Sequence, residues 1–348
     1  MNFSDHLKKQ LSLHPSMQPQ DVVKLCYQSA FGAEHLLPDP AKAKAYFETE
    51  FQKVSAADIP LYEEISPDIC RVNLSAWKKE DLPAEWLFRM FLGTATIPQK
   101  GENTFLQYLE AAEQVLSAHS VSFSREEWET YLCNYKKEGL RAVHHSDLYR
   151  MAEQPAYRIV RKQFLRLLPV LQAAAKLQKN DPIIIAIDGR AASGKTTLSD
   201  LLKRILSADV IHMDDFFLPL DLRTAERLAE PGGNIHYERF LEEIVPSLKK
   251  KKPFSYRIFD CSRMDYNGKQ TISSAPFCLV EGAYSCHPLF GEYADLKVFS
   301  DISPEEQMQR IRKRNGETMA EMFRNRWIPM EEAYYSHFHI KEKADIIL

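Results

Sequence analysis

The segment from Ile183 to Thr197 constrains the fold of this chain more than any other stretch of its sequence. It opens with a short apolar, β-branched run, which is typical of a strand buried on both faces. Apolar residues then recur at helical spacing from Leu198 to Ile205. Between them lies a complete G-x-x-x-x-G-K-[ST] pattern, formed with one following threonine by Gly189, Arg190, Ala191, Ala192, Ser193, Gly194, Lys195, Thr196 and Thr197.

The residue types of this loop suit a chain of phosphates. Gly189 and Gly194 allow the backbone to bend so that successive amides point at one anion. The helix that follows directs its N-terminal dipole at the same place. We expect Lys195 to reach the β- and γ-phosphates and the Thr196 hydroxyl to bind Mg²⁺. The alternative is a glycine-rich turn that binds nothing, and the flanking strand and helix count against it.

Composition and length bound the class of protein. A chain of 348 residues suggests two domains, and 45% hydrophobic with 27% charged residues indicates a globular protein. The net charge of −3 gives no reason to expect a nucleic-acid partner. Six cysteines without metal-ligand spacing indicate free thiols. Without a long apolar run, we expect a cytoplasmic protein with no membrane partner, and a homodimer is left open.

The pattern of the sequence changes near residue 180. Residues 1–178 are predicted to form a mainly α-helical domain, in which Asp39 and Ser124 have the features of helix caps. Residues 179–348 alternate between strand-like and helical runs, which predicts an α/β domain with a doubly wound parallel sheet. The strand-like runs are 183–188, 208–213, 254–259, 277–281 and 295–299, and the helical runs are 195–206, 237–251, 303–314 and 317–335.

Two carboxylates follow predicted strands, at the edge of the sheet where ligands bind. Asp214 comes after an apolar strand and before two phenylalanines, and a carboxylate there could accept a proton from a hydroxyl that attacks a phosphate. Glu281 stands where a second carboxylate could hold Mg²⁺ through water. An acidic N-cap for Asp214 and a bond from Glu281 to the local backbone are the structural alternatives.

Residues 182–348 resemble the uridine kinase and phosphoribulokinase branch of P-loop kinases. The resemblance rests on GRAASGKTT, HMDDFF, YRIFDCSR, LVEGAY, a basic helix and an Ala-Asp-Ile-Ile segment, in that order. It implies a P-loop kinase fold, ATP and Mg²⁺ as cofactors, and a small hydroxyl-bearing acceptor such as a nucleoside or related polyol. By the same resemblance, Asp214 is the general base and can also contact the metal.

Further positions match the substrate side of that family. Phe217, Phe259, Asp260 and Arg263 fall where substrate contacts are expected, and Arg310 and Arg314 fall on the basic helix that would close as a lid. A solvated helix end explains the two arginines equally well. The family histidine after the aromatic-Asp pair is missing, and phenylalanine replaces the sugar-binding tyrosine. These departures count against uridine as the acceptor.

Two other classes remain open from the sequence. A nucleotide switch that drives the helical domain would not need a carboxylate-aromatic acceptor site, and no strand ends in an apolar-Asp-Glu sequence. A nucleoside monophosphate kinase would need an arginine-rich acceptor pocket, which Arg257 and Arg263 leave open.

The amino-terminal half matches no family that its motifs identify. It holds polar clusters that could line a pocket or even hold a metal, although caps, turns and interhelical hydrogen bonds explain them better. Its role could be acceptor recognition, dimerisation or regulation. The clusters contain Glu34, His35, Arg71, Asn73, His144, His145, Tyr149, Arg150, Tyr157 and Arg158.

Overall fold

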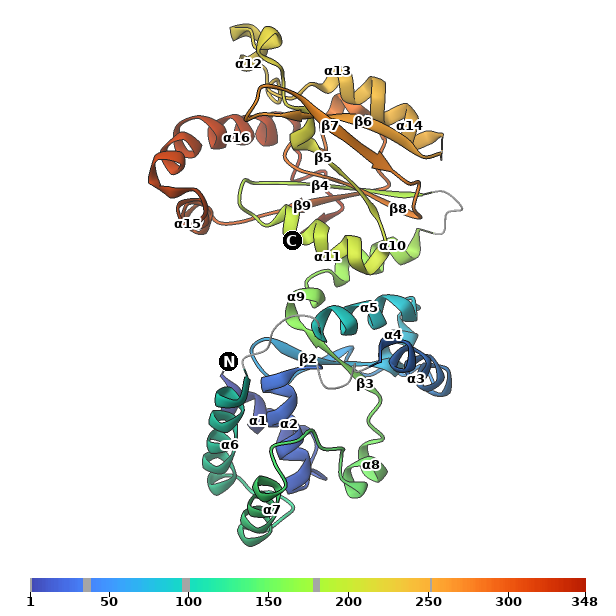
Figure 1. Ribbon diagram of the computed structural model, residues 1–348, viewed down its shortest axis with the longest axis vertical. Helices are drawn as coiled ribbons and strands as arrows, with labels where there is room; N and C mark the ends of the chain where they lie inside the picture. Colours follow the sequence, from blue (N-terminus) through green and yellow to red (C-terminus); the bar gives the residue numbers. More distant parts are fainter. Residues whose placement is uncertain (1, 34–38, 96–100, 178–181, 251) are drawn as a thin grey trace. The chain divides into compact units, whose positions relative to one another are not determined.

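The computed structural model describes residues 2–33, 39–95, 101–177, 182–250 and 252–348 (Figure 1). The chain divides into two compact units, Met1–Arg166 and Leu167–Leu348. The division lies before the boundary expected at residue 178, because helix α10 (Leu168–Lys176) contacts strand β9 of the second unit. Within the described ranges, every helix is too short or too polar to cross a bilayer.

The first unit combines helices with a small antiparallel sheet that the sequence did not predict. Its strands lie in the order β1 (Tyr62–Glu64), β2 (Ile69–Asn73) and β3 (Tyr157–Arg161). They are short, and β2 and β3 are far apart in sequence, so no local sequence pattern predicts that they pair. The helices are α1 (Phe3–Leu13), α2 (Pro19–Phe31), α3 (Pro40–Lys53), α4 (Leu74–Lys79), α5 (Ala84–Ala95), α6 (Gly101–Ala118), α7 (Arg125–Lys137), α8 (Asp147–Glu153) and α9 (Lys162–Leu165).

Two predicted helix caps are confirmed. The Asp39 carboxylate accepts hydrogen bonds from the amides at the start of α3, and Ser124 forms a reciprocal capping box with Glu127 at the start of α7. Pro169 stands in the first turn of a separate helix, α10. Proline suits that place because the first amides of a helix have no intrahelical acceptor.

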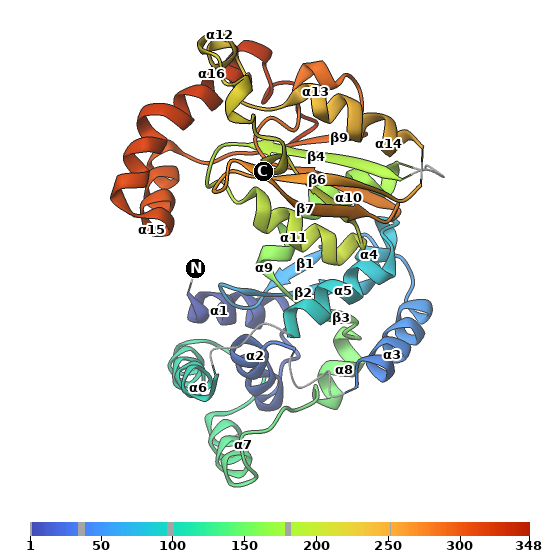
Figure 2. The ribbon, with the colours of Figure 1, turned by 45° about the horizontal axis from the view of Figure 1, so that its top comes forward.

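The second unit is built on a five-stranded parallel sheet in the order β10-β9-β4-β8-β5. All seven residues of the central strand β4 are buried, because it has strands on both edges and helices on both faces. Helices α10 and α11 (Lys195–Leu206) cover one face (Figures 1 and 2). The other face carries α13 (Tyr237–Arg239), α14 (Val245–Lys249) and α16 (Ile328–Phe338). The strands are β4 (Ile183–Gly189), β5 (Asp209–His212), β8 (Phe277–Glu281), β9 (Leu296–Ser300) and β10 (Ile346–Ile347).

The predicted strand at 254–259 is correct as a strand, but it does not join the parallel sheet. It forms β6 (Phe254–Asp260), which pairs antiparallel with β7 (Asp265–Ile272) in a separate hairpin. Strand propensity marks an extended segment and does not choose its partner.

The predicted helices of the second unit are present, and two of them are interrupted. The second helical run is split by a π-helical turn at Phe240–Ile244, and the last two runs are joined across a break at Gly316, which has φ 79°. The helices are α11 (Lys195–Leu206), α12 (Ala225–Ala229), α13 (Tyr237–Arg239), α14 (Val245–Lys249), α15 (Pro304–Met322) and α16 (Ile328–Phe338), with short 3-10 turns at Met213–Phe216, Leu220–Leu222 and Pro288–Phe290 and a second π turn at Phe323–Trp327.

Candidate active site

The glycine loop connects the end of β4 to the start of α11. Gly189 and Gly194 have φ of 137° and 102°, and Gly194 is the N-cap residue of α11. A Cβ atom on Gly189 would lie 2.1 Å from the backbone oxygen of Ser300. Both conformation and space therefore require glycine at this position, and the loop leads directly into the N-terminus of α11, where the free amides of a helix can meet a phosphate.

Side chains of α16, together with Asp301, hold the loop in place. Arg190 forms ion pairs with Asp301 and Glu332, so it fixes the loop and does not line the cavity. The amide of Ala191 donates to the Glu331 carboxylate at 2.9 Å, and the Tyr335 hydroxyl donates to the Gly189 carbonyl at 2.7 Å. The conformation of the loop therefore depends on residues far along the chain.

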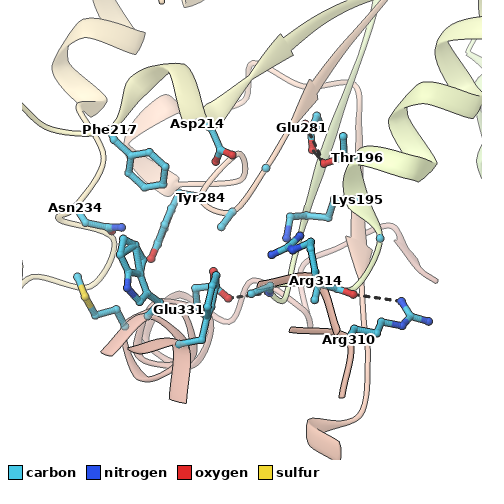
Figure 3. A pocket seen from close by; sticks show the side chains of 18 of the residues that line it. Lys195, Thr196, Asp214, Phe217, Asn234, Glu281, Tyr284, Arg310, Arg314 and Glu331 are labelled. Atoms are coloured by element: carbon cyan, nitrogen blue, oxygen red, sulfur yellow. Dashed lines mark hydrogen bonds between the residues drawn. The ribbon is translucent and has the colours of Figure 1, made fainter. Parts of the chain in front are cut away.

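A cavity of about 480 Å³ opens beside the loop at the carboxyl ends of β4, β5 and β8 (Figure 3). Of the predicted loop residues, Gly189, Arg190 and Ser193 lie outside its lining. Those that line it are Ala191, Ala192, Gly194, Lys195, Thr196 and Thr197. The crevice beyond the strand ends is where ligands bind in open α/β sheets.

Lys195, Thr196 and Glu281 meet on one side of this cavity (Figure 3). The Lys195 ammonium donates to the carbonyl oxygens of Gly189 and Arg190 at 2.5 and 2.9 Å. The Thr196 hydroxyl lies 3.5 Å from each carboxylate oxygen of Glu281. A hydroxyl and a carboxylate side by side are hard oxygen donors, so these residues fit Mg²⁺.

His212 is a member of the site that the sequence did not single out. Its Nδ1 lies 2.6 Å from an oxygen of Glu281, and that hydrogen bond raises the pKa of the imidazole.

In the part of the chain that the structure describes, no group of three or more His, Cys, Asp or Glu side chains is arranged to hold a metal. An ion held by Thr196 and Glu281 would therefore need further oxygen ligands from phosphate or water.

The structure separates the roles of the paired aspartates Asp214 and Asp215. The Asp215 carboxylate accepts a hydrogen bond of 2.9 Å from the Tyr256 hydroxyl, which ties it to the β6–β7 hairpin. Asp214 lines the cavity (Figure 3), and its carboxylate makes no hydrogen bond or ion pair with any described residue. Desolvation by the surrounding protein atoms raises the pKa of Asp214, and the negative charge of Glu281 raises it further. Such a carboxylate is available as a proton acceptor.

The side of the cavity opposite Lys195 carries aromatic and amide groups. Phe217, predicted from the sequence, lies there with Asn234 and Tyr284 (Figure 3). Trp327 also lines the cavity, and the sequence predicted none of these last three residues. Asn234 follows a Pro-Gly-Gly turn and Trp327 ends a π-helical turn, so neither belongs to the local pattern of the loop.

Three predicted substrate residues do not line this cavity. Phe259 is buried against Tyr266 within the hairpin, and Asp260 accepts hydrogen bonds from Ser262 in the turn, where Arg263 is exposed.

The predicted lid arginines both line the cavity from α15. Arg310 donates to the carbonyl oxygens of Ala192 and Ser193 at 3.2 and 3.4 Å and pairs with Glu306 at 2.5 Å. The Arg314 guanidinium donates to Asn315 at 2.7 Å. Two guanidinium groups therefore border the cavity, next to the space where phosphate charge would lie.

Burial of Glu331 leads to a test of stability against pH. Burial raises its pKa from 4.5 to about 7, so the folded state keeps its proton where the unfolded chain has lost it. Stability therefore falls as pH rises through this interval. Glu331→Gln keeps an oxygen acceptor for Ala191 and removes the titration.

We expect the free energy of unfolding of the Glu331→Gln variant, compared with that of the native protein, to rise by about 3 kcal/mol between about pH 4.5 and pH 8. Urea unfolding of both proteins at the two pH values measures this difference. If the free energies of unfolding of the two proteins changed in parallel with pH, the pKa of Glu331 would not be raised in the folded protein.

The strand order and the position of the glycine loop define the class of fold. A parallel five-stranded sheet whose central strand leads into a glycine loop and a helix fits the α/β P-loop kinase fold. No protein-family model matches the chain.

Solved structures with this class of fold are similar to about half of the chain. One is a possible uridine kinase from Bacillus stearothermophilus, with 19% identity and a TM-score of 0.43, covering 54% of this chain and 99% of that protein. Another is a proposed fructose transport system kinase from Silicibacter sp. TM1040, with 20% identity and a TM-score of 0.44, covering 52% and 98%.

Proposed function

We propose that this protein is a kinase that transfers the γ-phosphoryl group of ATP to a hydroxyl group of a small metabolite. The observation that carries the proposal is the position of Asp214. Its carboxylate has no partner among the described residues and lines the same cavity as Lys195 and Thr196. A protein that only binds or hydrolyses a nucleotide needs no such carboxylate beside an aromatic wall.

Each side chain has a defined part in this reaction. The loop amides and Lys195 hold the triphosphate, and Asp214 accepts the proton of the acceptor hydroxyl as its oxygen attacks the γ-phosphorus. The bond between that phosphorus and the β–γ bridging oxygen breaks, and ADP leaves. Arg310 and Arg314 balance the charge of the phosphates. Mg²⁺, held by Thr196 and Glu281, supplies further charge neutralisation when it is bound.

The aromatic side of the cavity is the proposed acceptor site. Phe217 and Trp327 offer flat apolar surfaces, while Asn234 and Tyr284 offer hydrogen-bonding groups. This mixture suits a nucleoside or a related polyol that carries several hydroxyl groups. Because phenylalanine replaces a hydroxyl-bearing tyrosine, uridine itself is not the acceptor that we favour.

An acceptor screen tests the proposal directly. The full chain is incubated with ATP, Mg²⁺ and panels of nucleosides, sugars and polyols, and products are detected by mass spectrometry. We expect at least one compound to gain a single phosphoryl group, with one ADP released for each product formed. The Asp214→Asn variant serves as the control in every reaction. ADP release that no acceptor stimulates would contradict the transfer reaction and favour a nucleotide switch.

A further inference from the structure

The first unit contains a cavity of its own, of about 540 Å³, to which the proposed reaction assigns no role. Residues of α2, α3, α5, α8 and β3 line it, together with the segments on either side of α8. It brings together several residues that the sequence analysis singled out, among them His144, His145, Arg150, Tyr157 and Arg158. Glu34 and His35, named with them, lie outside the described residues.

The charged groups that line this cavity are mostly cationic. Lys24, Arg150 and Arg158 face one carboxylate, Glu50, which pairs with Arg158 at 2.6 Å. Lys24 donates to the carbonyl oxygen of Val143 at 2.8 Å, and the Arg150 guanidinium forms no ion pair or hydrogen bond with any residue in the described ranges. Two positive charges therefore remain without a carboxylate partner in the described part of the wall.

A third cation lies directly behind the wall. Arg71 is only 2% exposed, and its guanidinium donates to the side-chain oxygens of Gln28 and Gln10, which are neutral amides. The same guanidinium lies 4.7 Å from the centre of the Tyr157 ring. Burial, and then the charge of Arg71, lower the pKa of Lys24 to about 8. The protein thus holds these cations close together at an energetic cost that an anion in the cavity would offset.

The buried carboxylate of Asp21 offsets this charge only in part, since it opposes the lowering of the Lys24 pKa that burial and Arg71 still bring to about 8. Asp21 is fully buried and accepts hydrogen bonds from His145 at 2.7 Å and from the Ser146 hydroxyl at 2.6 Å. Burial lowers the pKa of His145 to about 4, so the imidazole is neutral and its other nitrogen accepts from the Tyr157 hydroxyl at 2.6 Å. Gln28 in turn donates to that hydroxyl at 3.1 Å. This chain of hydrogen bonds fixes Gln28, Tyr157 and His145 in the wall.

We propose that this cavity binds a small phosphomonoester that carries a planar ring. A phosphate dianion matches the two cations, Lys24 and Arg150, that lack a carboxylate partner among the described residues. Tyr46, Phe91 and Pro155 supply apolar surface for the ring. The inference stands on the first unit alone and does not depend on the proposed transfer reaction.

Calorimetric titration of the full chain with AMP and UMP tests the site, with adenosine, uridine and inorganic phosphate as comparison probes. We expect one of the two monophosphates to bind, and Lys24→Met or Arg150→Met to weaken that binding by roughly 10- to 100-fold each. Lys137→Met and Arg141→Met, which change exposed cations of the same unit, are the matched controls. Lys195→Ala, which alters the other cavity, should leave this binding unchanged.

Each result of the titration either supports or contradicts the proposed site. Arg150 is exposed, so its variant tests the site even if Lys24→Met fails to fold, which circular dichroism would detect. Equal affinity for a nucleoside and its monophosphate would overturn the role of the phosphate. Binding that disappears in Lys195→Ala, or that neither Lys24→Met nor Arg150→Met weakens, would place the ligand elsewhere. Tighter binding of orotate, a planar carboxylate, than of either monophosphate would replace the phosphomonoester with a carboxylate.

Discussion

Replacing Asp214 with asparagine is expected to lower turnover by about 10²- to 10⁴-fold while nucleotide affinity stays nearly unchanged. Asparagine has almost the same shape, but its amide cannot take the proton of an attacking hydroxyl. The Asp214 side chain makes no hydrogen bond or ion pair with the described residues, so the substitution breaks no internal contact among them. Steady-state kinetics with the acceptor found by the screen, together with the dissociation constant of ATP, measure the two effects.

Asp215 provides the matched control for this prediction. It is the next residue in the chain, but its carboxylate is bound to the Tyr256 hydroxyl and holds the hairpin. Asp215→Asn should therefore affect stability more than turnover. A loss of turnover in Asp215→Asn as large as that in Asp214→Asn would show that the two aspartates have been assigned the wrong roles.

Replacing Lys195 with alanine is expected to weaken ATP binding and to lower kcat/KM by about 10²- to 10³-fold. The ammonium lies at the start of α11 and donates to two carbonyl oxygens of the loop, so it is held where the phosphates are proposed to bind. Its charge would contact those phosphates both in the bound state and in the transition state. Calorimetric titration with ATP and steady-state kinetics therefore should both register the change.

Lys203→Ala is the control for the lysine prediction. Lys203 is exposed in the last turn of the same helix, and the substitution removes an equal charge from α11 without touching the cavity. We expect its affinity and turnover to match those of the native protein. If Lys195→Ala also retained native affinity and turnover, the glycine loop would have no part in the mechanism.

The glycine loop could be predicted from the sequence because its parts are contiguous. A buried strand, two glycines with positive φ and a helix start lie within one short segment, and each is set by local chemistry. Residues that approach the site from distant segments were harder to find. His212 was overlooked although it lies two residues before Asp214, because its significance depends on contact with Glu281 from another strand.

The hairpin illustrates the same limit. The run at 254–259 has the composition of a strand, and the sequence placed it in the parallel sheet with Phe259 and Asp260 at the site. The structure pairs it with β7 and puts Phe259 inside the hairpin. Which strands pair depends on the sheet edges that are available when the chain folds, and short-range sequence patterns do not encode this.

Patterns within the sequence are enough to predict the glycine loop, the strand and helix around it, and the carboxylates that follow two other strands. Local backbone preferences and the period of apolar residues encode these features within a few positions. Long-range packing accounts for three other features: Asp214 and not Asp215 is open to the cavity, α16 holds the loop through Glu331 and Tyr335, and basic residues of the first unit enclose a cavity. Those outcomes depend on contacts between segments far apart in the chain, which form only when the whole core packs.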